Sequence, residues 1–319
     1  MNDLFAKIME AHQARLRAPS PLSRSAGLSA ALGCEVFLKC EHLQPTGSFK
    51  IRGASNKVRL LNAEARRRGV ITASTGNHGK AVAHAAQAAG LAATVYVAVG
   101  TAQTKIDGIR ALGAELVLVE GAAIDAELTA RAAATKQGKT YISPYNDLEV
   151  VAGQGTLGVE LLEQAPDLDA VFISVGGGGL IGGTGTALKN LRPRTEVVGV
   201  WADHSACMLR ALEAGAIVDV PEYPTLADGN LGAIEPGSVT FPICREVIEG
   251  KIVVTEAEIA AGMRSVAQSD QWIVEGSAGV AIAGLTQRAE AYRGKKVAVV
   301  LCGRNVSLET FLGAVGSSQ

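Results

Sequence analysis

Short apolar runs rich in β-branched residues alternate with longer segments of helical periodicity along most of this chain. The apolar runs predict strands at 36–39, 70–73, 94–99, 115–119, 171–175, 196–200 and 296–301. The periodic segments predict helices at 3–17, from about 53, and at 77–89, 106–112, 124–136, 180–191 and 205–214. This alternation is typical of an α/β fold with mostly parallel sheets, and runs that are apolar throughout indicate strands buried on both faces.

The same pattern predicts two domains. Residues 61–145 form a compact run of alternating strands and helices, which we expect to be a small domain with its own sheet. Residues 1–60 and 146–319 would then form a larger, discontinuous domain. A chain of 319 residues is long enough to build both cores.

Composition narrows the class of protein. Hydrophobic residues are 48% and charged residues 19% of the chain, as in globular proteins. A net charge of −1 means that the chain has no excess of basic residues for binding nucleic acid. Five cysteines without a CxxC pair favour a reducing cytoplasm over a disulfide framework or a structural zinc site. The longest apolar run, residues 81–99, is interrupted by His84, Gln87 and Gly90, so it predicts a buried helix, a turn and a strand, not a membrane span.

The segment 44–54 carries the first chemical signal. Pro45 and Gly47 predict a tight turn that places Lys50 at the start of a helix. A lone lysine at such a place is usually solvated. Here Phe49 offers an apolar face, and a partly desolvated lysine loses its proton more easily. The unprotonated amine can form a Schiff base with a carbonyl group.

Two loops between a strand and a helix provide candidate anion sites. The loop Ser74-Thr75-Gly76-Asn77-His78-Gly79 is suited to a carboxylate, although a capped strand–helix loop explains it equally well. The run Gly176-Gly177-Gly178-Gly179-Leu180 lets the backbone approach a phosphate closely at the start of a helix. It also satisfies the dinucleotide pattern G-x-G-x-x-G through Gly177, Gly179 and Gly182, with Glu196 beyond it. No Walker pattern is present.

Cys302-Gly303-Arg304-Asn305 follows the last predicted strand. A buried structural cysteine is the usual interpretation of Cys302. A contact with a ligand is the alternative, because the glycine-rich loop lies at another strand end.

A Schiff-base lysine, a phosphate loop and a carboxylate loop together indicate pyridoxal phosphate with an amino acid. With Ala227-Asp228-Gly229 and Glu275-Gly276-Ser277-Ala278-Gly279, these motifs resemble the fold-type II pyridoxal-phosphate enzymes, in the same order over about residues 15–312. The chain is most similar to their threonine/serine dehydratase and serine racemase branch. The Ser-Thr-Gly-Asn-His-Gly form resembles the hydroxyectoine-utilisation dehydratases. The resemblance implies two open, twisted, mostly parallel sheets, as in the tryptophan synthase β fold, with the cofactor between the domains.

The resemblance also implies roles for individual residues. Lys50 would hold the cofactor and act as the catalytic base, and Phe49 would pack against the cofactor ring. Asn77 would bond the 3-hydroxyl, and Cys302 would face the ring nitrogen. The phosphate would be held by Gly176, Gly177, Gly178, Gly179 and Leu180. The substrate carboxylate would be held by Ser74, Thr75, Gly76, Asn77 and His78.

The chain also departs from these relatives. Racemases that resemble it have a serine at the position of Thr75, which gives or takes the α-proton on the cofactor face opposite the lysine, and many threonine dehydratases have alanine there. The resemblance therefore makes Thr75 a candidate catalytic residue beside Lys50. Some relatives bind a divalent cation through a glutamate where this chain has Trp201, so we expect no metal. The biosynthetic threonine dehydratases carry a C-terminal regulatory domain, and we expect no feedback control by isoleucine here.

The sequence thus predicts a cytoplasmic lyase that removes water and then ammonia from a β-hydroxy α-amino acid such as threonine, serine or a hydroxyectoine-derived amino acid. A homodimer is what the family implies, and we expect neither a nucleic-acid nor a membrane partner. An amino-acid racemase on the same scaffold is the nearest alternative. A nicotinamide dehydrogenase and a binding protein without catalytic activity are the others.

Overall fold

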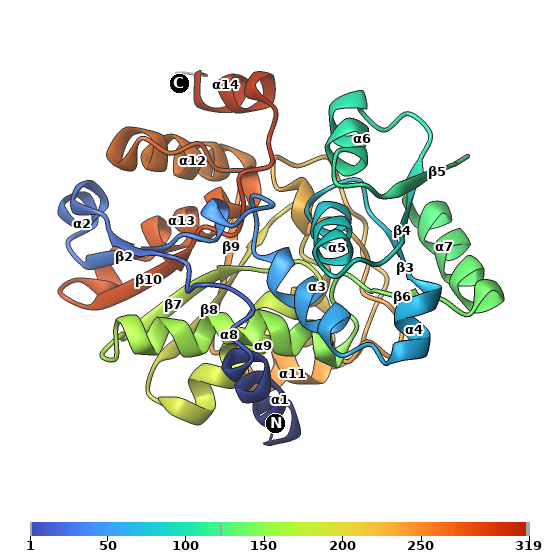
Figure 1. The fold of residues 1–319 in the computed structure, drawn as a ribbon. Coiled ribbons are helices and arrows are strands. Elements are labelled where there is room, and N and C mark those ends of the chain that lie inside the picture. Colours follow the sequence, from blue (N-terminus) through green and yellow to red (C-terminus); the bar gives the residue numbers. More distant parts are fainter. Residues whose placement is uncertain (1, 122, 317–319) are drawn as a thin grey trace.

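Two sheets organise the fold in the computed structural model, which describes residues 2–121 and 123–316 (Figure 1). The large sheet has the strand order β1-β2-β10-β7-β8-β9, and its strands are parallel except for the pair β1 and β2. Its strands are β1 (Leu22–Arg24), β2 (Glu35–Lys39), β7 (Ala170–Ser174), β8 (Glu196–Ala202), β9 (Gly250–Val254) and β10 (Lys296–Val300).

The small sheet has the order β5-β4-β3-β6 and is parallel throughout. Its strands are β3 (Val70–Ala73), β4 (Ala93–Ala98), β5 (Glu115–Val119) and β6 (Thr140–Tyr141). All four lie within the predicted block 61–145, while the boundaries of that block stay a prediction.

Helices cover both faces of each sheet (Figure 1). In the first half of the chain they are α1 (Asn2–Gln13), α2 (Ala26–Leu32), η1 (Glu41–Leu43), α3 (Lys50–Arg59), α4 (Ala63–Arg68), α5 (Asn77–Ala88), α6 (Gln103–Arg110) and α7 (Ala123–Gln137). In the second half they are α8 (Leu148–Gln164), α9 (Gly179–Leu191), α10 (Cys207–Ala214), η2 (Asp228–Asn230), α11 (Thr240–Val247), α12 (Glu256–Asp270), α13 (Gly276–Gln287), η3 (Ala289–Tyr292) and α14 (Leu308–Gly316).

The core of the large unit lies between these layers. Helix α13 packs on β7 and β8 from one side, while α9 and α8 cover the other side (Figure 1). The central strands β7, β8 and β10 are almost entirely buried, with Phe172 and Trp201 fully inside. This burial on both faces is why these strands consist of continuous apolar runs.

Glycines bring α3 and α8 into unusually close contact. A Cβ on Gly53 would lie 2.7 Å from the carbonyl oxygen of Val150. A Cβ on Gly153 would lie 2.6 Å from the carbonyl oxygen of Arg52. Because the two backbones touch, α3 has one fixed position, and Lys50 is its first residue.

A buried ion network fixes the same helix. Arg52 donates to Glu41 at 2.8 Å and to Glu160 at 2.6 Å, and Lys39 donates to Glu160 at 2.7 Å. These four side chains come from β2, η1, α3 and α8 and are almost fully buried. Two carboxylates therefore balance two cations inside the protein, which is the condition for burying such charges.

The predicted α/β class is confirmed, and the structure corrects several element boundaries. The first helix ends at Gln13, not at 17, and α3 begins at Lys50, not near 53. The helix predicted at 106–112 is α6, which begins and ends earlier, at Gln103 and Arg110. The helix predicted at 205–214 is α10, which begins two residues later, at Cys207. Within the described residues, no helix combines the length and the apolar character that crossing a membrane would require.

Candidate active site

Lys50 has the environment of a reactive amine. Its Nζ donates to the carbonyl oxygen of Pro144 at 2.9 Å and lies 5.2 Å from the centre of the Phe49 ring. Burial lowers the pKa of Lys50 to about 8, although Cys302 and Glu275 act to raise it. About a tenth of the amines would therefore be unprotonated at pH 7, far more than for a solvated lysine.

The turn before Lys50 is joined to the segment after β10. Gly47 has φ +76°, which favours glycine, and its carbonyl accepts from the backbone N–H of Arg304 at 2.9 Å. The N–H of Phe49 donates to the carbonyl of Cys302 at 3.0 Å. These bonds bring Lys50 and Cys302 into one site from opposite ends of the chain.

Cys302 is buried and uncharged. Its Sγ lies 3.8 Å from Oγ of Ser174 and 3.9 Å from Oε1 of Glu275. Burial, followed by the charge of Glu275, raises the pKa of Cys302 well above its usual value, so it remains a thiol. A neutral thiol and a hydroxyl thus face this part of the site.

The glycine-rich loop connects β7 to α9. Gly178 has φ +83° and is the N-cap residue of α9. The backbone N–H groups of the first turn that follows it have no partner within the helix. A Cβ on Gly177 would lie 2.4 Å from the ring of Tyr145, and one on Gly176 would lie 2.8 Å from the carbonyl of Asn230. Gly179 and Leu180 begin α9 and are buried. Close packing therefore excludes side chains from this loop.

The second predicted loop connects β3 to α5. His78 is buried, and its Nε2 lies 2.9 Å from the carbonyl of Ile142. Burial lowers the pKa of His78 to about 3, so the ring is neutral and its Nδ1 is an acceptor. The backbone N–H of Gly76 donates to Oγ of Ser74 at 3.2 Å, and Thr75 lies half-buried between them. A Cβ on Gly79 would meet the carbonyl of Ser74 at 2.2 Å, so the loop requires glycine there.

Two residues of the site were not assigned from the sequence. Nδ2 of Asn77 lies 2.9 Å and 3.1 Å from the two carboxylate oxygens of Glu275. Oδ1 of Asn77 accepts from Nδ2 of Asn305. Burial raises the pKa of Glu275 to about 7. Glu275 begins one of the motifs and Asn305 ends another, but their contact with Asn77 arises only in three dimensions.

Several buried polar atoms fit a polar ligand at this place. Within the described part of the chain, they have no hydrogen-bond partner, and they belong to Thr46, Ser48, His78, Asn230 and Ser277. Ser48 pairs with Gly303 by a β-bridge, Asn230 touches Gly176, and Ser277 lies 2.9 Å from a Cβ built on Gly229. Buried polar groups are rarely left unpaired, so these atoms are available to a polar ligand bound at this place.

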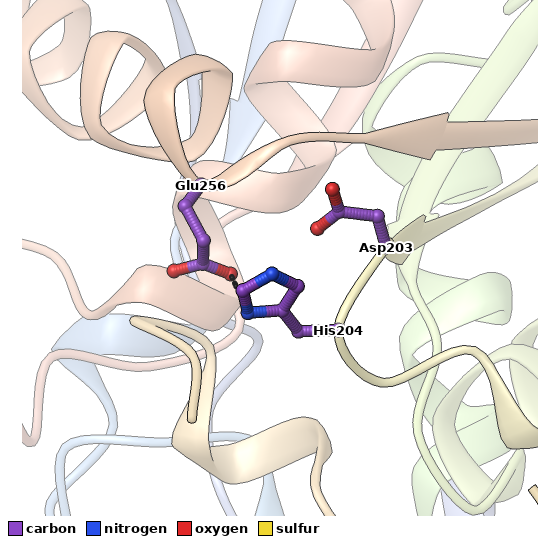
Figure 2. Close-up of side chains that lie close together, drawn as sticks. All are labelled: Asp203, His204 and Glu256. Atoms are coloured by element: carbon purple, nitrogen blue, oxygen red, sulfur yellow. Dashed lines mark ion pairs between the residues drawn. The ribbon is translucent and has the colours of Figure 1, made fainter. Parts of the chain in front are cut away.

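Figure 2 shows a separate cluster of possible metal ligands: Asp203, His204 and Glu256, with ligand atoms within 4.8 Å of one another. Glu256 accepts from the backbone N–H of Leu226 at 2.7 Å, and Nδ1 of His204 lies 2.7 Å from the carbonyl of Pro224. Both side chains therefore hold the segment that leads to η2. That catalysis uses no metal stays a prediction.

Comparisons with known proteins agree with this geometry. The family model described as "Pyridoxal-phosphate dependent enzyme" matches residues 14–303. The L-threonine ammonia-lyase of Thermotoga maritima is 39% identical over 90% of this chain and 71% of its own length.

Two solved structures have the same fold. Processed threonine deaminase isoform 2 of Solanum lycopersicum superposes with a TM-score of 0.94 at 35% identity, covering 99% of this chain and 94% of that one. Maize serine racemase superposes with a TM-score of 0.91 at 29% identity, covering 98% and 96%. The chain therefore belongs to the pyridoxal-phosphate-dependent enzymes of fold type II.

Proposed function

We propose that this enzyme is an ammonia-lyase that converts a β-hydroxy α-amino acid, such as threonine or serine, into a 2-oxo acid and ammonia. One observation carries the proposal: the amine of Lys50 has a lowered pKa, lies 5.2 Å from the centre of the Phe49 ring and donates to the carbonyl of Pro144. The ring of Tyr145, the next residue, packs against Gly177 of the glycine-rich loop. The similarity to an L-threonine ammonia-lyase and a threonine deaminase supports this reaction class.

The chain supplies a binding group for each end of the cofactor. Gly176 to Gly179 and Leu180 would hold the phosphate at the N-terminus of α9, where backbone N–H groups and the helix dipole favour an anion. Phe49 would lie against the ring, and Asn77 would donate to its 3-oxygen. When bound, pyridoxal phosphate supplies an electron sink for the bond electrons of the substrate.

Lys50 would serve twice in turnover. Its amine would hold the cofactor in the resting enzyme and would be free once the substrate amine has taken its place. The released amine would then take the α-proton, because a pKa of about 8 lies close to physiological pH and leaves about a tenth of the amine unprotonated at pH 7. The β-hydroxyl would leave with a proton as water, and hydrolysis of the released enamine would then consume a water molecule and yield the 2-oxo acid and ammonia.

Cys302 would favour this outcome over transamination. Its buried thiol, beside the hydroxyl of Ser174, offers the ring nitrogen a neutral partner. A carboxylate in the same place would favour the protonated form of the ring nitrogen and so stabilise the carbanion more fully.

An amino-acid racemase is the second candidate, supported by the similarity to maize serine racemase and by the hydroxyl of Thr75. Inversion requires an acid or base on the face opposite Lys50. Threonine retains a hydroxyl there, but its β-branch restricts the rotamer. We therefore propose slow racemisation beside faster elimination.

The test is a substrate panel with serine, threonine, 3-hydroxyaspartate and hydroxyectoine-derived amino acids, scored for 2-oxo acid and for D-isomer. We expect 2-oxo acid to form faster than D-isomer with at least one substrate. Faster racemisation with every substrate would establish the racemase instead. Borohydride reduction followed by peptide mapping should place the cofactor on Lys50, and a label on another lysine would contradict the site assignment.

We also propose that the enzyme works in the cytoplasm as a homodimer, as the family resemblance implies. Five free, buried cysteines fit a reducing compartment. Light scattering of the purified protein should give about twice the chain mass of 32.8 kDa.

A further inference from the structure

A closed set of hydrogen bonds fixes the amide group of Asn77. Asn77 begins α5 beside the small sheet, whereas Glu275 precedes α13 on the large sheet. The carboxylate of Glu275 accepts from Nδ2 of Asn77 and, at 2.9 Å, from the backbone N–H of Asn305. One carboxylate therefore joins the N-terminus of α5 to the segment after β10.

The two partners of Asn77 determine which way its amide points. An asparagine amide can be turned over with almost no change in shape, so its neighbours decide where its donor and its acceptor lie. Here an anionic acceptor, Glu275, faces the NH₂ group, and a donor, Nδ2 of Asn305, faces Oδ1. Asn305 is itself oriented, because its Nδ2 also donates to the carbonyl of Thr46 at 2.9 Å and its Oδ1 accepts from Lys80 at 3.0 Å.

We propose that Glu275 is a positioning residue that holds Asn77 as a hydrogen-bond donor to the 3-oxygen of pyridoxal phosphate. Both carboxylate oxygens of Glu275 lie within hydrogen-bond distance of Nδ2 of Asn77. The two oxygens can share one N–H of the NH₂ group, and the second N–H is then left for the ligand. The inference rests on the role proposed above for Asn77.

Close packing keeps the carboxyl group of Glu275 in this place. Glu275 is 2% exposed. A Cβ on Gly303 would lie 2.5 Å from its Oε1, so only glycine leaves room for the carboxyl group. A displaced or shortened side chain at 275 could not reach both Asn77 and the N–H of Asn305.

The charges around Glu275 make the arrangement sensitive to pH. Glu275 interacts electrostatically with four titratable groups: Lys50 of α3, Lys80 of α5, Asp228 of η2 and Cys302 after β10. Burial, the largest effect, raises the pKa of Glu275 to about 7. Above pH 7 the carboxylate therefore accepts from Asn77, and below pH 7 protonation removes part of this acceptor capacity.

The experiment is a double-mutant cycle on cofactor binding. Apoenzymes of wild type, Asn77→Ala, Glu275→Leu and the double variant are titrated with pyridoxal phosphate. We expect each single change to weaken binding about tenfold, as for loss of one hydrogen bond to a charged group. The double variant should be no weaker than Asn77→Ala, because Glu275 acts through Asn77.

A spectroscopic titration supplies the second measurement. In the reconstituted wild type, the absorbance band of the bound cofactor should shift with a midpoint near pH 7, and this transition should be absent in Glu275→Gln. The matched control is Glu196→Gln, which changes a half-buried glutamate at the start of β8 that accepts from the hydroxyl of Tyr292 at 2.8 Å. It should retain the wild-type affinity and pH transition.

Each outcome decides the inference. If Asn77→Ala binds the cofactor as wild type does, the proposed role of Asn77 fails and the inference fails with it. If Asn77→Ala weakens binding but Glu275→Leu does not, only the inference is overturned. Losses that multiply in the double variant would show that Glu275 acts independently. If Glu275→Leu does not fold, Glu275→Gln replaces it in the cycle.

Discussion

Two substitutions of Gly178 separate the effect of backbone strain from the effect of charge at the glycine-rich loop. Gly178 has φ +83°, and a Cβ there would lie 2.6 Å from Sγ of Cys244 and 3.0 Å from the methyl carbon of Met208. The left-handed conformation costs a non-glycine residue about 1–2 kcal/mol, and overpacking costs about 1–3 kcal/mol more. We expect Gly178→Ala to lower the free energy of unfolding by about 2–5 kcal/mol.

Gly178→Asp adds a negative charge to the same strain. Two unit charges about 5 Å apart, at an effective dielectric constant of about 20, repel each other by about 3 kcal/mol. This energy corresponds to roughly a hundredfold in affinity. We therefore expect Gly178→Asp to bind pyridoxal phosphate about a hundredfold more weakly than Gly178→Ala, which is its control for strain.

Fluorescence titration of the apoenzymes measures the affinities, and urea denaturation measures stability. Adding Cys244→Ala to Gly178→Ala removes the closest atom and should recover part of the lost stability. Equal cofactor affinity in the aspartate and alanine variants would refute the assignment of the phosphate to this loop. Wild-type stability of Gly178→Ala would refute the strain argument.

Three further predictions concern reactive groups. The rate at which apoenzyme takes up pyridoxal phosphate should rise about tenfold per pH unit and level off near pH 8, because only the neutral amine of Lys50 reacts. A stopped-flow profile in which the rate still rises towards pH 10.5 would contradict the lowered pKa of Lys50. Cys302→Ser should keep most elimination activity and Cys302→Asp should increase transamination, whereas wild-type kinetics and spectra in both would make Cys302 a core residue only. Thr75→Ala should lose racemisation more than elimination, followed as α-proton exchange in deuterated water; equal losses would restrict Thr75 to binding the carboxylate.

Local sequence patterns predicted the strands and helices whose own residues show a clear apolar run or helical period. The seven strands predicted from apolar runs were each found within one or two residues, as β2, β3, β4, β5, β7, β8 and β10. Of these, β5 is an edge strand without buried residues, contrary to the expectation of burial on both faces, and β9 was not predicted. The strands β1 and β6 have only three and two residues, too few for a period to be visible. Helix α8 was missed because Gly153, Gly155 and Gly158 lower its helix propensity. Those glycines are needed where α8 crosses α3 and α9 at backbone contact, a tertiary demand that outweighs propensity.

The same limit applies to the site. Lys50 and the glycine-rich loop carry their signals within a few consecutive residues, so they could be proposed from the sequence. Glu275 is separated from Asn77 by 198 positions, and its function depends on a contact that only the fold creates. The residues that hold a cofactor directly are therefore easier to find than those that orient them.

Two neighbouring cations on α3 show how position determines chemistry. Burial alone would lower the pKa of both Lys50 and Arg52. Hydrogen-bonded carboxylates of Glu41 and Glu160 reverse this for Arg52 and raise its pKa, which makes it a permanent charge that anchors the helix. The amine of Lys50 meets a carbonyl oxygen in place of a carboxylate, and its pKa falls to about 8. Because Arg52 is held rigidly two positions away, Lys50 can remain desolvated without moving to a hydrogen-bonded counterion. A fixed helix and an amine without a hydrogen-bonded carboxylate are what a reactive lysine requires.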